Sequence, residues 1–231
     1  MAVIAQESMH YSNLVKQEEG ISWGKCKKVV TINGAAATLP IGSVLGEFVA
    51  SPTATASAVT GTGNGVFGSI TMTSVDGLEL GRYTVKIVKT VANAGDFVLL
   101  DPKGKVIGTG QVATAFNQAG FSFTIADGST DFVAGDYFTV TVAGTVKCKL
   151  IEATATDGSQ RAKYVLVGDA TGAPVSVVAA LNTDVKALVL YRDCAVADSA
   201  LTYGASVDTD AERADIKAQL EAQRIDVLAQ Y

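Results

Sequence analysis

The chain has 231 residues, of which 48% are hydrophobic and 18% are charged, and its formal net charge is −5. This length and hydrophobic content allow one large domain or two small ones with a real core, and they exclude a wholly disordered chain. The 18 Lys and Arg are scattered, which argues against a nucleic-acid partner, because such partners need a basic surface. Neither a bilayer-spanning apolar run nor a signal peptide is evident, so we expect a soluble protein made in the cytoplasm, with no membrane partner.

Cysteine and histidine are too few for the usual metal or nucleophile chemistry. The three cysteines, Cys26, Cys148 and Cys194, lie far apart and are odd in number, which predicts buried reduced thiols and no disulfide framework. With His10 as the single histidine, neither a Cys/His metal cluster nor a Cys-His nucleophile can be assembled. We therefore predict no metal, no cofactor and no enzymatic activity.

Residues 1–27 have weak periodicity and are interpreted as an N-terminal arm. An extended segment with spaced apolar side chains can add as a strand to an exposed sheet edge of a partner. A frayed terminus is the alternative, and Trp23 could equally be a buried staple for the arm. The candidate partner-binding side chains are Val3, Ile4, Met9, Tyr11, Leu14 and Trp23.

The arm is followed by two strands and then by an uncharged tract. Residues 28–32 are a β-branched run, and a second strand follows Pro40 and continues to Val49. The tract Ser51–Gly65, SPTATASAVTGTGNG, contains Val59 as its one sizeable apolar side chain. It has three possible interpretations: a linker, a glycosylated stalk, or the seam at which one module is inserted into another.

Residues 66–142 have β patterns throughout, with Tyr83, Val85 and Ile87 on one face of a strand. Residues 97–100 and 106–108 should form a hairpin around the turn 101–104. This predicts a compact β-sandwich or barrel. Five aromatic residues suggest either a sugar-binding platform or, as strand alternation favours, the core: Phe121, Phe123, Phe132, Tyr137 and Phe138.

Two loops resemble ligand sites only superficially. The segment 127–131 has two acidic residues, but its spacing fails the EF-hand pattern for calcium. The segment 61–65 is glycine-rich, but it lacks the spacing and the following helix of a phosphate loop. Both are interpreted as turns.

The C-terminal part contains further strands and one helix. Strands are expected over 145–151, 163–167 and 186–191. Thr209 and Glu212 form a capping box, with Ile216 and Leu220 following at helical spacing, so a helix should extend to about Gln223. Residues 225–228 then return to the pattern of a strand.

Several pieces of the chain follow one another in a characteristic order: the arm ending in Glu19-Gly20-Ile21-Ser22, the strand 28–32, the segment 39–46 (LPIGSVLG), the segment 187–203 and the capped helix with its final strand. In this order they resemble the head-decoration (capsid cement) proteins of lambda-like tailed bacteriophages. The resemblance covers roughly residues 7–50 and 145–228. It implies a mainly β fold with one C-terminal α-helix, in which a small β-barrel-like core carries an extended arm and an inserted β-sandwich or barrel module.

The resemblance also implies domain limits and a function. The core would comprise residues 28–56 plus 143–231, the arm 1–27, and the inserted module 57–142. The implied function is structural: a virion protein on the outer capsid surface that bridges major capsid protein subunits, itself a homo-oligomer, expected to be a trimer. The inserted module could bind host-surface glycans. The alternative is a carbohydrate-binding phage fibre or adhesin-like β protein.

Overall fold

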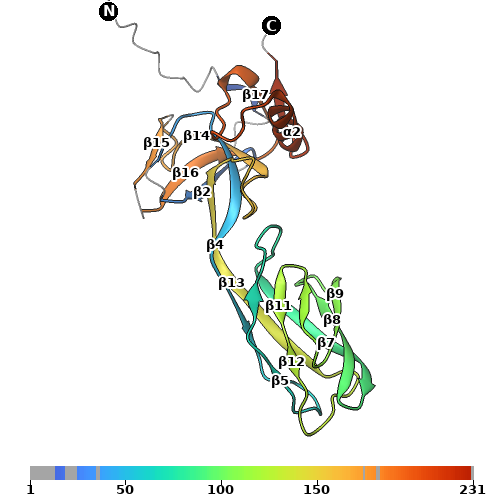
Figure 1. Ribbon diagram of the computed structural model, residues 1–231. Coiled ribbons are helices and arrows are strands. Elements are labelled where there is room, and N and C mark those ends of the chain that lie inside the picture. The colour runs from blue at the N-terminus through green and yellow to red at the C-terminus, as the bar shows by residue number, and fades with distance from the viewer. Residues whose placement is uncertain (1–13, 19–24, 35–36, 174, 181–182, 230–231) are drawn as a thin grey trace, which may run out of the picture. The chain divides into compact units, whose positions relative to one another are not determined.

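The computed structural model describes residues 14–18, 25–34, 37–173, 175–180 and 183–229 (Figure 1). These residues form a mainly β structure with one α-helix near the C-terminus, as predicted. The chain divides into two compact units, the first comprising residues 1–48 and 146–231 and the second residues 49–145. The chain enters the second unit along β4 (Val44–Ala56) and leaves it along β13 (Tyr137–Leu150).

The first unit is built on a closed five-stranded barrel. Its strands follow the order β2 (Lys27–Ile32), β16 (Val185–Leu190), β14 (Ala162–Asp169), β4 and β13. The strand β13 then pairs with β2 in parallel, through Cys148 and Ile32, and this pairing closes the barrel. Closure leaves these five strands without a free edge.

Strand alternation separates two hydrophobic clusters on the two faces of the barrel wall. In β14, Tyr164 and Leu166 belong to one cluster, which takes side chains from all five strands and therefore fills the interior. The neighbouring Val165 and Val167 belong to the other cluster, on the outside. The short strands β3 (Ala37–Leu39) and β15 (Val177–Ala179) pair with each other beside the interior cluster.

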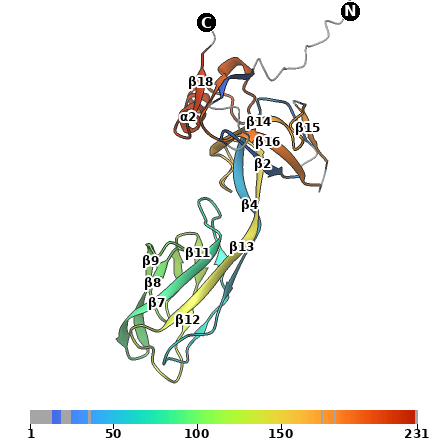
Figure 2. The same ribbon diagram turned by 180° about the vertical axis from the view of Figure 1, so that it is seen from behind.

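The outer cluster is covered by a small sheet and a helix. The sheet has the order β1 (Val15–Glu18), β17 (Cys194–Ala197) and β18 (Ile225–Leu228). A 3₁₀ turn, Asp198–Ala200, follows β17. The helix α2 (Asp210–Glu221) contacts β14 and β18 (Figures 1 and 2).

The helix begins at the predicted capping box. The Thr209 hydroxyl accepts a hydrogen bond from the Glu212 amide at 3.2 Å, and the Glu212 carboxylate accepts one from the Thr209 amide at 3.0 Å. The helix buries Ile216 and Leu220, as its spacing predicts. Arg224 takes φ +65°, the left-handed conformation that glycine usually supplies after a helix, and the chain then continues directly into β18.

The second unit packs short strands over the sheet of β13, β7 (Gly81–Val91), β8 (Ala94–Leu100) and β9 (Val106–Gln111). The predicted hairpin is present, with Leu100 opposite Val106. One cluster of buried side chains joins the layers, including Phe121, Phe123, Phe132 and Phe138, whereas Tyr137 is 37% exposed. The short strands are β5 (Val66–Phe67) with β12 (Ile125–Ala126), and β6 (Thr71–Met72) with β11 (Phe121–Phe123) and β10 (Phe116–Gln118).

The uncharged tract is largely strand and ordered loop. Residues 51–56 continue β4, with Ser51, Thr53 and Thr55 exposed and the intervening residues half-buried. Ala54, Ala56 and Val59 pack against the core of the second unit. The alternation is therefore present, but alanine takes the inward positions where large apolar side chains are usual.

Candidate functional site

Of the side chains proposed for partner binding, Leu14 is the one that the structure describes. It is fully buried in the outer cluster of the first unit, beside the residues of β17 and α2. The remaining five candidates, Val3, Ile4, Met9, Tyr11 and Trp23, lie outside the described residues. The structure therefore places the base of the arm inside the core of its own chain.

The strand after Leu14 is paired on one side. β1 runs antiparallel to β17, with Val15 opposite Val196 and Glu18 opposite Cys194. The strand β17 also pairs in parallel with β18, on the side away from β1. The central strand of this small sheet is β17, whose side chains are all buried, so the base of the arm is attached to the most buried part of the sheet.

An ion pair and a backbone hydrogen bond join β17 and β18 at their shared end. Arg224 Nη2 lies 2.5 Å from Asp193 Oδ1, and the Cys194 amide donates to the Arg224 carbonyl. Both Asp193 and Arg224 have positive φ. Asp193 directly precedes β17 and Arg224 directly precedes β18, so the bonds between them fix the parallel register of the two strands.

A polar network lies in the first unit, and no local sequence pattern predicts it. Lys28 Nζ donates to the Tyr164 hydroxyl at 2.7 Å, and that hydroxyl donates to Glu47 Oε2 at 3.0 Å. Lys163 forms an ion pair with the same carboxylate. These groups come from β2, β4 and β14, more than 100 positions apart in some pairs, so only the closed barrel brings them together.

Burial shifts the pKa values of several groups in this network. Burial raises the pKa of Tyr164, and the Glu47 charge adds to this effect. Burial also lowers the pKa of Lys28, although Glu47 partly opposes it. The neighbouring Cys148 has a pKa raised to about 12 by burial. The thiol is therefore protonated at neutral pH and is a poor nucleophile, and all three cysteines are buried thiols, as predicted.

The glycine-rich segment 61–65 surrounds an internal carboxylate. The amides of Thr62 and Gly63 donate to the two oxygens of Asp136, each at 2.9 Å, and the Val133 amide adds a third bond at 3.0 Å. A side chain at Gly61 would collide, because its Cβ would lie 1.9 Å from Asp136 Oδ1. The segment thus binds an anion, but that anion belongs to its own fold.

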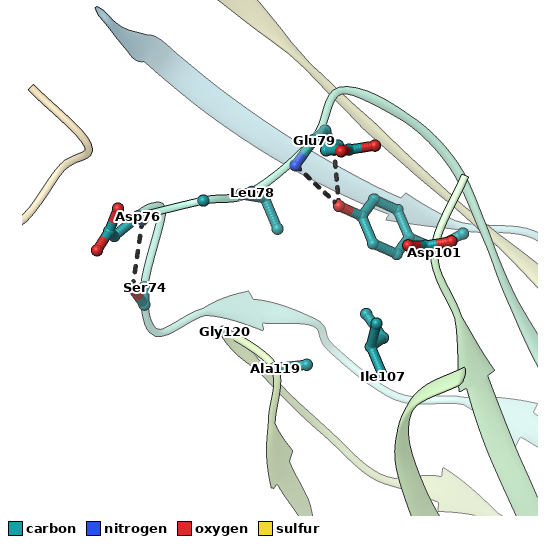
Figure 3. A pocket seen from close by; sticks show the side chains of 10 residues that line it. Ser74, Asp76, Leu78, Glu79, Asp101, Ile107, Ala119 and Gly120 are labelled. Carbon is teal, nitrogen blue, oxygen red and sulfur yellow. Dashed lines mark hydrogen bonds between the residues drawn. The ribbon is translucent and has the colours of Figure 1, made fainter. Parts of the chain in front are cut away.

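The second unit also contains an open pocket of about 370 Å³ (Figure 3). It is lined by the loop before β7, by one residue of β7, by the turn after β8, by one residue of β9 and by the turn between β10 and β11. The lining residues are Ser74, Asp76, Gly77, Leu78, Glu79, Tyr83, Asp101, Ile107, Ala119 and Gly120. Polar and apolar side chains therefore border the same space.

Two further observations concern metals and membranes. Among the described residues, no group of three or more His, Cys, Asp and Glu side chains is arranged to hold a metal ion. In the acidic loop 127–131, Asp131 Oδ1 instead accepts a hydrogen bond from the Asn93 amide at 2.9 Å. Within the same described part of the chain, no helix has the length and apolar character needed to cross a membrane.

The comparison with protein families decides the assignment. The family of bacteriophage lambda head decoration protein D matches residues 4–225, which is nearly the whole chain. The chain belongs to this family. Head decoration proteins are structural proteins of the phage virion that associate with the capsid, so this chain has a structural, capsid-associated role.

Other comparisons add little to this assignment. A search of curated proteins gives no match. Two crystal structures of Xanthomonas campestris FlgL, in space groups H3 and C2, are similar to part of the chain, with 24% and 23% identity and TM-scores of 0.31 and 0.30. The matched regions cover 46% and 48% of this chain, and they cover 33% of each FlgL chain. Likenesses this distant carry no argument about fold or function.

Proposed function

We propose that this head decoration protein binds the outer surface of the phage shell and stabilises it by bridging neighbouring major capsid protein subunits. The family match over residues 4–225 carries this proposal. DNA packed inside a shell pushes outward, and contacts that bridge subunits raise the free energy needed to separate them. A patch of roughly 1,600 Å² per site is sufficient, because binding repeated over a lattice multiplies modest affinities.

The capsid-binding element in this proposal is the N-terminal arm. Its apolar side chains Val3, Ile4, Met9, Tyr11 and Trp23 would fill pockets while its backbone adds to a sheet edge of the capsid protein. The structure supports a distinct role for Leu14, as the anchor of the arm. A force that pulls on a bound arm is resisted by the buried Leu14 side chain and by the pairing of β1 with β17. Force on the arm would thus reach the core of the first unit.

A symmetric homotrimer is part of the same proposal. A trimer carries three arms. Once the first arm is bound to the shell, the effective concentration of the second and third arms at the shell surface is raised. Light scattering on the purified protein measures the oligomeric state directly. A monomeric mass at the concentrations used for shell binding would overturn the trimer but leave the capsid-binding role intact.

The test of the arm uses expanded, undecorated phage shells and co-sedimentation. Deleting residues 1–13 removes the proposed contacts of Val3, Ile4, Met9 and Tyr11 but keeps Trp23, Leu14 and β1. The first unit should therefore retain its melting temperature while the protein stays largely in the supernatant. A finer pair of variants is M9S with Y11S, expected to weaken binding, and S8A with S12A, expected to bind normally. Stoichiometric binding by the deletion variant would refute the arm as the binding element.

A further inference from the structure

The pocket in the second unit is suited to a ligand that the capsid role does not involve. It lies wholly within residues 74–120, and its volume of about 370 Å³ falls in the range of small-molecule sites.

The walls of the pocket are held in place by the fold. The Thr73 amide donates to the Gly120 carbonyl at 2.8 Å, tying the two loops together. Gly120 has φ +80°, and a Cβ there would lie 2.7 Å from the Ser74 carbonyl oxygen. On the other side, the Tyr83 hydroxyl donates to the Glu79 carbonyl at 2.8 Å and accepts from the Glu79 amide at 3.1 Å (Figure 3). The pocket is therefore preorganised, which lowers the entropic cost of binding.

The polar lining offers hydrogen-bond acceptors with spare capacity. Asp101 Oδ1 accepts from the amides of Lys103 and Lys105, at 2.9 and 2.8 Å. Glu79 Oε1 is paired with the Lys103 ammonium. The second oxygen of each carboxylate accepts no hydrogen bond from the described residues, and the Ser74 hydroxyl can still donate. Two acceptors and one donor thus border one space.

The charge at the pocket is already partly balanced. The Lys103 ammonium forms an ion pair with Glu79, and its pKa is raised first by this hydrogen bond and, to a smaller extent, by the charge of Asp101. The Asp76 carboxylate also lines the pocket, so an anionic ligand would be repelled. The acceptor oxygens favour a ligand rich in O–H donors that carries no negative charge.

Apolar groups complete the recognition surface. The side chains of Leu78 and Ile107 border the same space in Figure 3. Tyr83 also lines the pocket. A ligand that presents hydroxyls on one side and C–H groups on the other would match both kinds of lining. A pyranose ring has this distribution of groups.

We propose that this pocket binds the ring of a neutral saccharide, with the free oxygens of Glu79 and Asp101 accepting from ring hydroxyls and Leu78 and Ile107 contacting the C–H face. Sugars that carry a carboxylate, such as glucuronate, should be excluded by repulsion.

The test is methyl NMR of the intact protein titrated with the methyl glycosides of glucose, galactose, mannose and N-acetylglucosamine at millimolar concentration. At least one should shift the methyl signals of Leu78 and Ile107 in a saturable manner, and glucuronate should not. If all four leave these signals unchanged, the proposal is refuted. If glucuronate or 1,5-diaminopentane shifts them instead, the ligand class is wrong.

Two matched variants separate pocket binding from binding elsewhere. S74W places a large ring at the exposed edge of the pocket and should abolish the shifts, whereas V106W adds the same ring at an exposed neighbour of Ile107 that does not line the pocket and should preserve them. If S74W does not fold, E79Q provides the second measurement and should weaken binding at least threefold. Equal binding by wild type and E79Q would count against the proposed contacts. Shell co-sedimentation of the same samples reports on the arm independently.

Discussion

The amide of Gly63 donates a hydrogen bond of 2.9 Å to Oδ2 of Asp136, a carboxylate that is only 5% exposed. The two residues are 73 positions apart in the chain. Gly63 belongs to the loop that follows β4, and Asp136 directly precedes β13. This bond therefore joins the entry and exit segments of the second unit.

Replacing Asp136 by Asn should destabilise the second unit. Asn offers one acceptor oxygen in place of two, so at least one of the three amide donors loses its partner, at a cost of about 1–3 kcal/mol. The change in the free energy of unfolding is measured by urea unfolding, which is followed by NMR signals of the second unit or by the fluorescence change as Tyr83 becomes exposed. D226N, at an exposed strand position of the first unit, is the control for the loss of one charge and should unfold like wild type.

The stability of the second unit should fall in acid because of the same residue. Burial acts to raise the pKa of Asp136, but the amides of Val133, Gly63 and Thr62 outweigh it, so the pKa lies below its usual range. A carboxyl with a lowered pKa in the folded state contributes stability above its unfolded value, about pH 4, and this contribution is lost as the pH falls through the folded value. D136N should flatten the acid side of the stability profile, and an unchanged slope would show that other groups dominate it.

The anchoring role of Leu14 predicts a large effect on the first unit. L14A should leave a cavity in the outer cluster and lower the free energy of unfolding by about 2–5 kcal/mol. The matched control is L228A, because Leu228 is the same residue type but is 44% exposed in β18, and its effect should be within about 0.5 kcal/mol. Thermal unfolding monitored by circular dichroism compares them. Equal effects would mean that the arm is not anchored through Leu14.

The capping box predicts a smaller and more local effect. T209A removes the acceptor for the Glu212 amide and should cost about 1 kcal/mol. E212Q keeps a side-chain acceptor that reaches the Thr209 amide and should cost less than T209A. Amide hydrogen exchange in the first turn of α2 reports the difference. Faster exchange in E212Q than in T209A would contradict the observed hydrogen-bond pattern.

Removal of the second unit tests the proposal that it is an insertion in a discontinuous domain. An ideal Cβ on Gly144 would lie 2.4 Å from a Val49 methyl and 3.4 Å from the Pro52 Cα, so the two crossing strands are adjacent there. Replacing residues 52–143 by a short Gly-Ser turn should therefore leave the first unit folded and able to bind shells. Loss of its cooperative unfolding transition would show that the first unit requires the second.

Local sequence patterns determined the secondary structure well. The capping box and the spacing of Ile216 and Leu220 predicted α2, since a cap and a helical stripe involve residues within a few positions of one another. The alternation of Tyr83, Val85 and Ile87 predicted their burial for the same reason. Residues 51–56 were the failure, because alanines at the inward positions do not produce a visible hydrophobic period.

The tertiary structure alone decided which distant residues meet. The closure of the barrel through Cys148 and Ile32, the burial of Leu14 and the amide shell around Asp136 each join segments that no local pattern relates. A hydrogen-bond donor or an apolar side chain can be recognised in a sequence, but its partner is selected by the packing of the whole chain. For the arm, the sequence therefore indicated its apolar side chains, whereas the fold determined that Leu14 belongs to the core.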